Sequence, residues 1–152
     1  MLQTKAGGPA SPQALRELML RKAEKLSRGK QLRVGFLEGA TAGRKGASAA
    51  QVAFINEFGA PAAGIPPRPF FRVMIRLNQK GWARIMAAGL KKDGDPATAM
   101  ALLGEKIRSQ LQRSIGGWSS PPNTDEVAKR KHKNTPLKDT KNMMNAVDYE
   151  VS

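Results

Sequence analysis

Cysteine is absent from this 152-residue chain, and histidine occurs once. The lack of cysteine excludes disulfides and thiolate chemistry, and the two scarcities together argue against a zinc site, because Cys and His are the main zinc ligands. No apolar run approaches the roughly 18 residues of a membrane-spanning helix, and the first ten residues lack the apolar centre of a signal peptide. We therefore expect a soluble intracellular protein with no metal, no cofactor and no membrane contact.

Aromatic and acidic residues are also scarce. Aromatics make up 5% of the chain, so the base-stacking platforms of single-strand binders are not indicated. Twelve Asp and Glu against 26 Lys and Arg leave a formal net charge of +14. A small domain needs a net charge of only roughly 2–8 for solubility, and a larger positive field attracts polyanions. Charge alone therefore favours a nucleic-acid partner over a surface that is basic only for solubility.

The positive charge is unevenly distributed. Residues 1–30 carry a net charge of +5 and residues 68–117 carry +7, whereas 31–67 and 118–152 carry +1 each. The two strongly basic segments are also the most helical by pattern.

No arrangement of residues predicts an enzyme. The one histidine, His132, lies between lysines in KRKHKN, without a serine or acid placed to form a triad. Asp93 and Asp95 resemble a metal pair, but a turn and a helix cap explain them better. The glycine-rich stretch 39–48 is not a phosphate-binding loop, because Arg44 stands where that motif requires glycine. We expect no catalytic activity.

The N-terminal half predicts a flexible arm over residues 1–11, followed by a single domain over 12–152. Ser11 and Pro12 are start signals for a helix over 12–28. Alternating apolar residues from Leu32 predict a strand that ends at Gly39. The loop tip 39–48 follows.

Further start signals define the next elements. A capping box at Ser48–Gln51 predicts a helix over 49–58, and prolines exclude regular structure in 60–69. A long amphipathic helix is expected over 69–92, with Pro69 in its first turn and with Phe70, Met74 and Leu77 on the apolar side.

The opposite side of this long helix is basic. Cations recur every four residues from Arg68 through Arg72, Arg76, Lys80 and Arg84, with no Asp or Glu between them. The ordinary fate of helical charges is a solvated face. Because no i,i+4 partner relieves the repulsion here, we favour a surface that faces a polyanion.

The C-terminal half predicts more helix and a final strand. Asp95 and Pro96 begin a helix that ends at 116–117, and short helices are expected over 124–131 and from Asp139 to Asn145. Alternation over 147–151 predicts a strand. The expected fold is α+β, with a small antiparallel or mixed sheet packed against a long amphipathic helix and several shorter helices, and with a third strand completing the sheet.

Two stretches resemble a known family. The first runs AQVAFINEFGAP…IPPRPFFR, and the second includes PLKDT. They resemble motifs of the neck and tail-completion proteins of long-tailed double-stranded-DNA phages, a family that includes the lambda-like minor tail protein Z group and putative tail-component proteins. The matching residues are Asn56, Glu57, Phe58, Gly59, Ile65, Pro66, Arg68, Pro69, Phe70, Arg72, Pro136, Leu137, Asp139 and Thr140. Lys141 replaces the family's usual glycine, so the local turn there is expected to differ.

The resemblance implies a structural virion protein at the head–tail junction, made in the host bacterial cytoplasm. It implies a ring of copies of the chain, for which we expect six, that joins neck to tail and surrounds the DNA channel. The implied neighbours are head-closure and tail-terminator or tail-tube proteins. The cations expected to face the DNA are Arg72, Arg76, Lys80 and Arg84. Such contacts to phosphate would be independent of DNA sequence.

The motif residues themselves favour a structural role or a contact between subunits. Phe58, Phe70 and Phe71 are expected core anchors, Gly59 a helix cap, and Arg68 a partner of Glu57. Three alternatives remain open: a tail terminator ring of the same tail, a basic duplex-DNA-binding accessory protein outside the virion, and an RNA-binding protein, which would leave both motifs unexplained.

Overall fold

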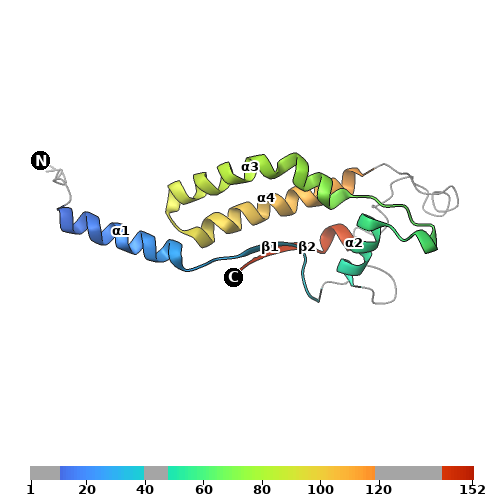
Figure 1. Cartoon of the computed structure of the whole chain (residues 1–152), viewed down its shortest axis with the longest axis horizontal. Coiled ribbons are helices and arrows are strands. Elements are labelled where there is room, and N and C mark those ends of the chain that lie inside the picture. Colours follow the sequence, from blue (N-terminus) through green and yellow to red (C-terminus); the bar gives the residue numbers. More distant parts are fainter. Residues whose placement is uncertain (1–10, 40–47, 119–141) are drawn as a thin grey trace, which may run out of the picture.

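A computed structural model describes residues 11–39, 48–118 and 142–152. Their elements are, in chain order, α1 (Pro12–Ser27), β1 (Leu32–Phe36), α2 (Ala49–Phe58), the 3₁₀ turn η2 (Pro61–Ala63), α3 (Phe70–Asp93), α4 (Pro96–Gly117), α6 (Asn142–Asn145) and β2 (Val147–Val151). Figure 1 shows α3 and α4 side by side along the strands, with α1 projecting at one end and α2 at the other. The predicted α+β class is confirmed.

The sheet joins the two halves of the chain. Strand β1 pairs antiparallel with β2, with Leu32 opposite Val151 and Phe36 opposite Val147. Two strands alone are marginal in water, and here both pack against α4. The expected third strand is wrong for the described residues, since their sheet has two strands. Helix α4 covers this two-stranded sheet and stabilises it, as a third strand would have done.

A glycine of α4 lets the sheet approach closely. A Cβ atom at Gly104 would lie 2.5 Å from Cδ2 of Tyr149 and 2.9 Å from Cδ1 of Leu32. Both strands therefore contact the helix at the point where it has no side chain. The spacing of apolar residues in α4 gave no sign of this contact.

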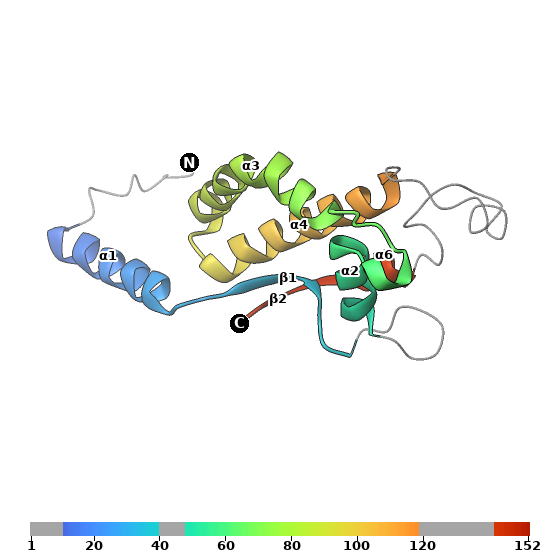
Figure 2. The same ribbon diagram turned by 45° about the vertical axis from the view of Figure 1, so that its right-hand side comes forward.

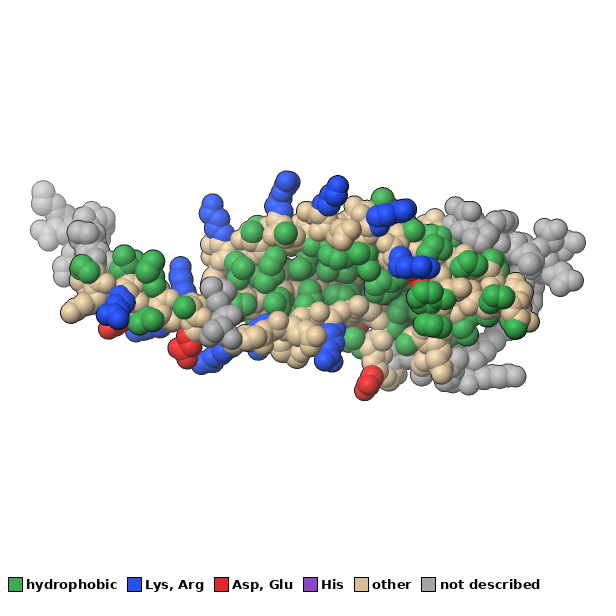
Figure 3. Space-filling view, in the orientation of Figure 1, with side chains coloured by type: hydrophobic (Ala, Val, Ile, Leu, Met, Phe, Trp, Pro, Cys, Tyr) green, Lys and Arg blue, Asp and Glu red, His purple; other side chains and the backbone are tan. Residues whose placement is uncertain are grey.

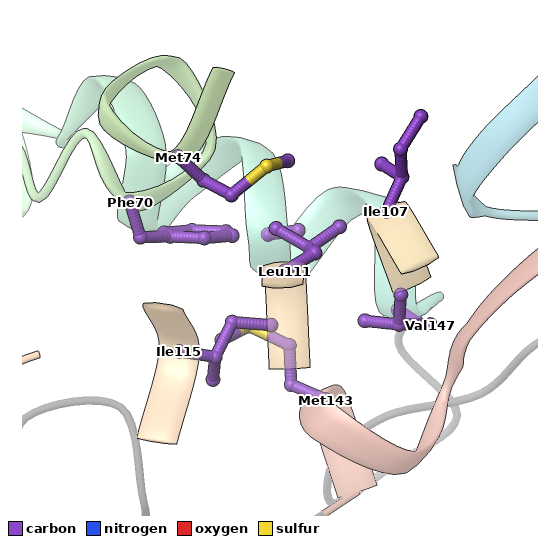
Figure 4. Close-up of a cluster of buried hydrophobic side chains, with 9 residues drawn as sticks. Phe70, Met74, Ile107, Leu111, Ile115, Met143 and Val147 are labelled. Carbon is purple, nitrogen blue, oxygen red and sulfur yellow. The ribbon is translucent and has the colours of Figure 1, made fainter. Parts of the chain in front are cut away.

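The core lies between α3, α4 and the C-terminal segment. Figure 4 shows side chains from these elements meeting in one cluster. Its buried members include Phe70, Met74, Ile107, Leu111, Ile115, Met143 and Val147. The apolar residues of α4 recur at helical spacing and predict a buried stripe of Met100, Leu103, Ile107, Leu111 and Ile115. The last three of these positions are buried.

The prediction that Leu77 lies on the buried, apolar side of α3 is wrong, because its relative exposure is 72%. The buried face of α3 includes Phe70, Met74 and Gly89. At roughly 100° per residue, Leu77 lies about 60° from Met74, on the side away from Gly89. On the same wheel Leu77 also lies within about 20° of Phe70, which is fully buried, so the angle around the helix does not by itself explain its exposure.

Helix α1 forms as predicted, and residues 11–25 lie outside the core. Ser11 caps it by accepting a hydrogen bond from the amide of Ala14 at 3.2 Å. All of residues 11–25 are exposed. These residues therefore contribute nothing to the core.

Several boundaries differ slightly from the expected ones. The capping box of α2 is present with both of its hydrogen bonds. Pro69 is the N-cap of α3 rather than a residue of its first turn. The segment expected to lack regular structure contains the 3₁₀ turn η2, which tolerates Pro61 at its start. Helix α6 begins at Asn142. In the described ranges, no helix is long and apolar enough to cross a membrane.

The N-cap of α4 gives a testable pH dependence. The Asp95 carboxylate accepts hydrogen bonds from the hydroxyl and the amide of Thr98, at 2.7 and 3.0 Å, and these bonds lower its pKa from 3.8. A carboxyl whose pKa is lower in the folded than in the unfolded protein stabilises the fold at pH values above its unfolded-state pKa. This stability is lost as the pH falls through its folded-state pKa. We expect an NMR titration of the Asp95 carboxyl carbon to have its midpoint below 3.8. A midpoint at or above that value would contradict the cap.

Candidate nucleic-acid interface

A row of cations follows the exposed side of α3. Arg76, Lys80 and Arg84 are exposed and lie four residues apart. Each step of four residues rises about 6 Å along a helix, so the row spans about 12 Å. In Figure 3, blue side chains line the upper edge of the molecule over α3. None of the three forms an ion pair with a carboxylate in the described part of the chain.

The geometry of α3 explains why this row is exposed. The three cations lie roughly 200–280° around the helix from Met74, which is buried against α4. Packing of the apolar side therefore turns the basic side outward. Together, Arg76, Lys80 and Arg84 form the α3 row.

Arg72 does not belong to this row of unpaired cations. Its Nε donates to Oε1 of Glu57 at 2.7 Å, and its guanidinium lies 4.9 Å from the ring centre of Phe58. The expectation of an unpaired ridge is therefore wrong at Arg72. Sequence spacing missed the partner because Glu57 comes from α2 rather than from a neighbouring turn of α3.

Glu57 links the end of α2 to the start of α3. Its side chain is 7% exposed. One carboxylate oxygen accepts from the amide of Phe71 at 2.9 Å, and the other accepts from the amide of Arg72 at 3.3 Å. Amides in the first turn of a helix have no intrahelical acceptor, and Pro69 provides no side-chain cap. A carboxylate from another helix thus caps α3, where the helix dipole also favours negative charge.

The remaining motif residues hold the connection between these two helices. The side-chain amide of Asn56 donates to the main-chain carbonyl of Val52 at 2.8 Å. The main-chain carbonyl of Asn56 accepts from the main-chain amide of Arg68 at 2.7 Å. Arg68 has 7% relative exposure, and burial lowers its pKa below the ordinary value of arginine. The ion pair that the structure gives Glu57 is with Arg72 rather than with Arg68, the partner expected from the sequence.

The loop after α2 turns back on itself. Gly59 caps α2 with φ +77°, as expected, and donates to the carbonyl of Ile55 at 2.8 Å. Ala60 and Ile65 pair as an antiparallel bridge across the loop. Pro66 is half-buried beside this turn. Gly59 is thus the helix cap that the sequence predicts, and the structural role of the motif as a whole stays a prediction.

The aromatic residues of the motif have different fates. Phe70 is fully buried and Phe71 packs against the core. Phe58, the third expected anchor, is 51% exposed, and its ring lies 4.7 Å from that of Phe54, which is 63% exposed. The prediction that Phe58 anchors the core is therefore wrong. The end of α2 turns these rings outward because the short helix uses Ala49, Ala53 and Glu57 for its buried side.

An apolar hollow lies beside these exposed rings. It has a volume of about 370 Å³, and β1, α2 and the start of α3 surround it. Its walls include Val34, Phe36, Phe54, Phe58 and Phe71. Sequence reasoning did not identify this hollow, because its walls come from three separate segments.

The matching residues of the second motif, Pro136, Leu137, Asp139 and Thr140, lie outside the described residues. The same is true of His132, of most of the loop tip 39–48 and of the helix expected over 124–131. Within the described ranges, no group of three or more His, Cys, Asp or Glu residues could hold a metal ion.

Comparison with known proteins identifies no relative: no family model, no curated protein and no solved structure matches the chain. The resemblance of the two motifs to phage neck proteins therefore stays a prediction.

Proposed function

We propose that this protein is a structural, non-catalytic component of a phage virion, located at the junction of head and tail. In this role it forms a ring, for which we expect six copies, that joins neck to tail and surrounds the DNA channel. Its neighbours are head-closure and tail-terminator or tail-tube proteins. The chain is made in the cytoplasm of the bacterial host and then enters the particle.

The observation that carries the DNA-binding part of this proposal is the unpaired α3 row. Three cations on one rigid helix repel one another, and neutralisation by phosphates would relieve that repulsion. Binding of phosphates by Lys and Arg gives affinity without reading the base sequence. A DNA channel needs this property, because all sequences of the genome pass through it.

The motif residues support the virion part of the proposal in a different way. Asn56, Glu57 and Gly59 connect α2 rigidly to α3, which bears the row. A motif with this task is expected in any protein that must hold the start of its DNA-facing helix in a constant position. Its resemblance to motifs of the phage neck family supports the proposal that this helix lies in a ring.

Removing the α3 row should weaken DNA binding and make it less sensitive to salt. Each phosphate contact adds about 0.9 to the slope of log K against log salt. The variant Arg76→Gln/Lys80→Gln/Arg84→Gln should therefore lower the slope by about 3. Between about 50 and 200 mM salt, the wild type should lose roughly 40-fold more affinity than the variant. Fluorescence anisotropy with two unrelated labelled duplexes measures this difference.

The matched control removes three cations elsewhere. Arg16, Lys106 and Arg113 are exposed on α1 and α4, and changing them to Gln gives the same net charge. This control should bind both duplexes nearly as the wild type does. Equal losses in the two variants would show that net charge rather than the α3 row binds DNA. Arg72 is left intact, because its ion pair with Glu57 links α2 to α3.

The virion proposal is tested by copy number. Quantitative mass spectrometry on gradient-purified particles from cells that produce the protein should give a small symmetric number, such as six or twelve. Absence from the particles would overturn the virion assignment. Loss of DNA binding in the α3-row variant, together with that absence, would favour the duplex-DNA-binding accessory protein.

A further inference from the structure

Within the part of the chain that the structure describes, two apolar surfaces are left without a partner. The first is one side of α1, where Leu15, Leu18 and Met19 have relative exposures of 49%, 51% and 64%. The second is the hollow beside α2, with its exposed rings of Phe54 and Phe58. These are called the α1 stripe and the α2 hollow below.

Helix α1 needs a partner to be stable. It has 16 residues, which is only slightly more than the length of about 12–15 residues below which isolated helices are marginal in water. Most helical stability comes from packing of an apolar side against other elements. Residues 11–25 are all exposed. Burial of the α1 stripe must therefore come from another surface of matching character.

The two surfaces lie at opposite ends of the molecule. Figures 1 and 2 show α1 at one end, α2 at the other, and β1 running between them in both views. The chain is extended at Arg28, just after α1. In this arrangement α1 cannot reach the α2 hollow of its own chain, but it can reach the hollow of a second copy.

Electrostatics favour this pairing. The segment 1–30 has a net charge of +5, whereas 31–67, which supplies most of the hollow, has +1. The cation at the rim of the hollow, Arg72, is already paired with Glu57. In the described residues of 31–67, one cation, Arg33, stands against the carboxylates of Glu38 and Glu57. A basic helix therefore meets a segment with little positive charge, and a polyanion would find little to bind there. Aromatic residues at the centre of an interface are also typical of protein partners.

We propose that the α1 stripe of one copy docks in the α2 hollow of the next, so that copies of this chain join head to tail. Contacts between two different surfaces generate a ring when the rotation closes and an open filament when it does not. Because it assigns the surfaces between neighbouring subunits, this inference rests on the proposed ring. It also predicts that α1 spans each boundary between subunits.

The absence of native cysteine makes a cross-linking test direct. One chain carries Met19→Cys and a second carries Phe54→Cys, and the mixture is mildly oxidised. A disulfide-linked dimer should form and be visible on a non-reducing gel. Leu20 provides the matched control, since it is 60% exposed on the other side of α1. Leu20→Cys mixed with Phe54→Cys should give several-fold less dimer. Equal yields, or no dimer in either mixture, would overturn the proposal.

Light scattering on the full chain separates this inference from the proposed function. Met19→Glu should weaken association at least about tenfold, because docking would bury an unpaired charge, whereas Leu20→Glu should associate as the wild type does. If Met19→Glu assembles normally, the docking proposal is wrong and the ring uses other surfaces. If the wild type stays monomeric at all concentrations, the docking proposal is also wrong, while copy number in virions still decides the proposed function.

A second cross-linking arrangement tests whether α1 folds back on its own chain. The double variant Met19→Cys/Phe54→Cys should form oligomers linked between chains. A monomer with an internal disulfide would overturn docking between copies.

Discussion

Replacing Gly59 by alanine is expected to lower the stability of this protein by about 3 kcal/mol or more. Two independent costs add at this position. The backbone has φ +77° and ψ 174°, a conformation that is nearly restricted to glycine and costs about 1–3 kcal/mol for other residues. A Cβ atom would also lie 2.8 Å from both the carbonyl oxygen of Ile65 and the nitrogen of Pro67. These atoms belong to the backbone of the returning loop, so no side chain can rotate away.

Gly64 in the same loop is the matched control. It also has a positive φ, +66°, but a Cβ there would meet no atom within 4 Å. Gly64→Ala should cost only the conformational strain, about 1–2 kcal/mol. Urea unfolding followed by tryptophan fluorescence measures both variants. Equal losses would show that the close approach of the loop to Gly59 does not contribute.

Removing the carboxylate of Glu57 should have the second-largest effect, about 2–3 kcal/mol for Glu57→Ala. The side chain is almost fully buried and accepts from two amides of α3 and from Arg72. Without it, the amide of Phe71 loses its acceptor in a partly buried place. Glu57→Gln keeps one side-chain acceptor and should lose roughly half as much.

The two partners of this ion pair should respond unequally. The Arg72 side chain is 59% exposed, so water can replace the contacts of its guanidinium in Arg72→Gln. This variant should therefore lower the free energy of unfolding by less than about 1 kcal/mol. Glu105→Gln, at an exposed ion pair with Arg108, is the control and should change stability by about 0.5 kcal/mol or less. If Arg72→Gln is as damaging as Glu57→Ala, the ion pair rather than capping of α3 is the main contribution of Glu57. Thermal unfolding of the four variants distinguishes these cases.

The two stability predictions and the α3 row concern one continuous piece of structure. Gly59 directs the loop, Glu57 caps α3, and α3 presents the cations. A loss of DNA binding in Glu57→Ala at a temperature where the variant remains folded would show that the start of α3 positions the row. The α3-row variant should by contrast keep the stability of the wild type.

Local signals in the sequence determined the secondary structure well. The caps at Ser11, Ser48 and Asp95 correctly began their helices. Helical periodicity correctly gave the length of α3 and α4, and alternation identified β2. These signals act within a few residues, so the chain does not need its tertiary structure to express them. Net charge and the spacing of the α3 row were likewise visible in the sequence.

Only the tertiary structure decided which of these features lie inside and which face water. The capping of α3 by Glu57, the approach of Tyr149 to Gly104 and the outward turn of Phe58 each depend on elements distant in sequence. Apolar spacing identifies the side of a helix but not whether another element covers it, which is why Leu77, expected on the apolar side of α3, is exposed. Burial is a property of pairs of surfaces, and the sequence by itself describes one surface at a time.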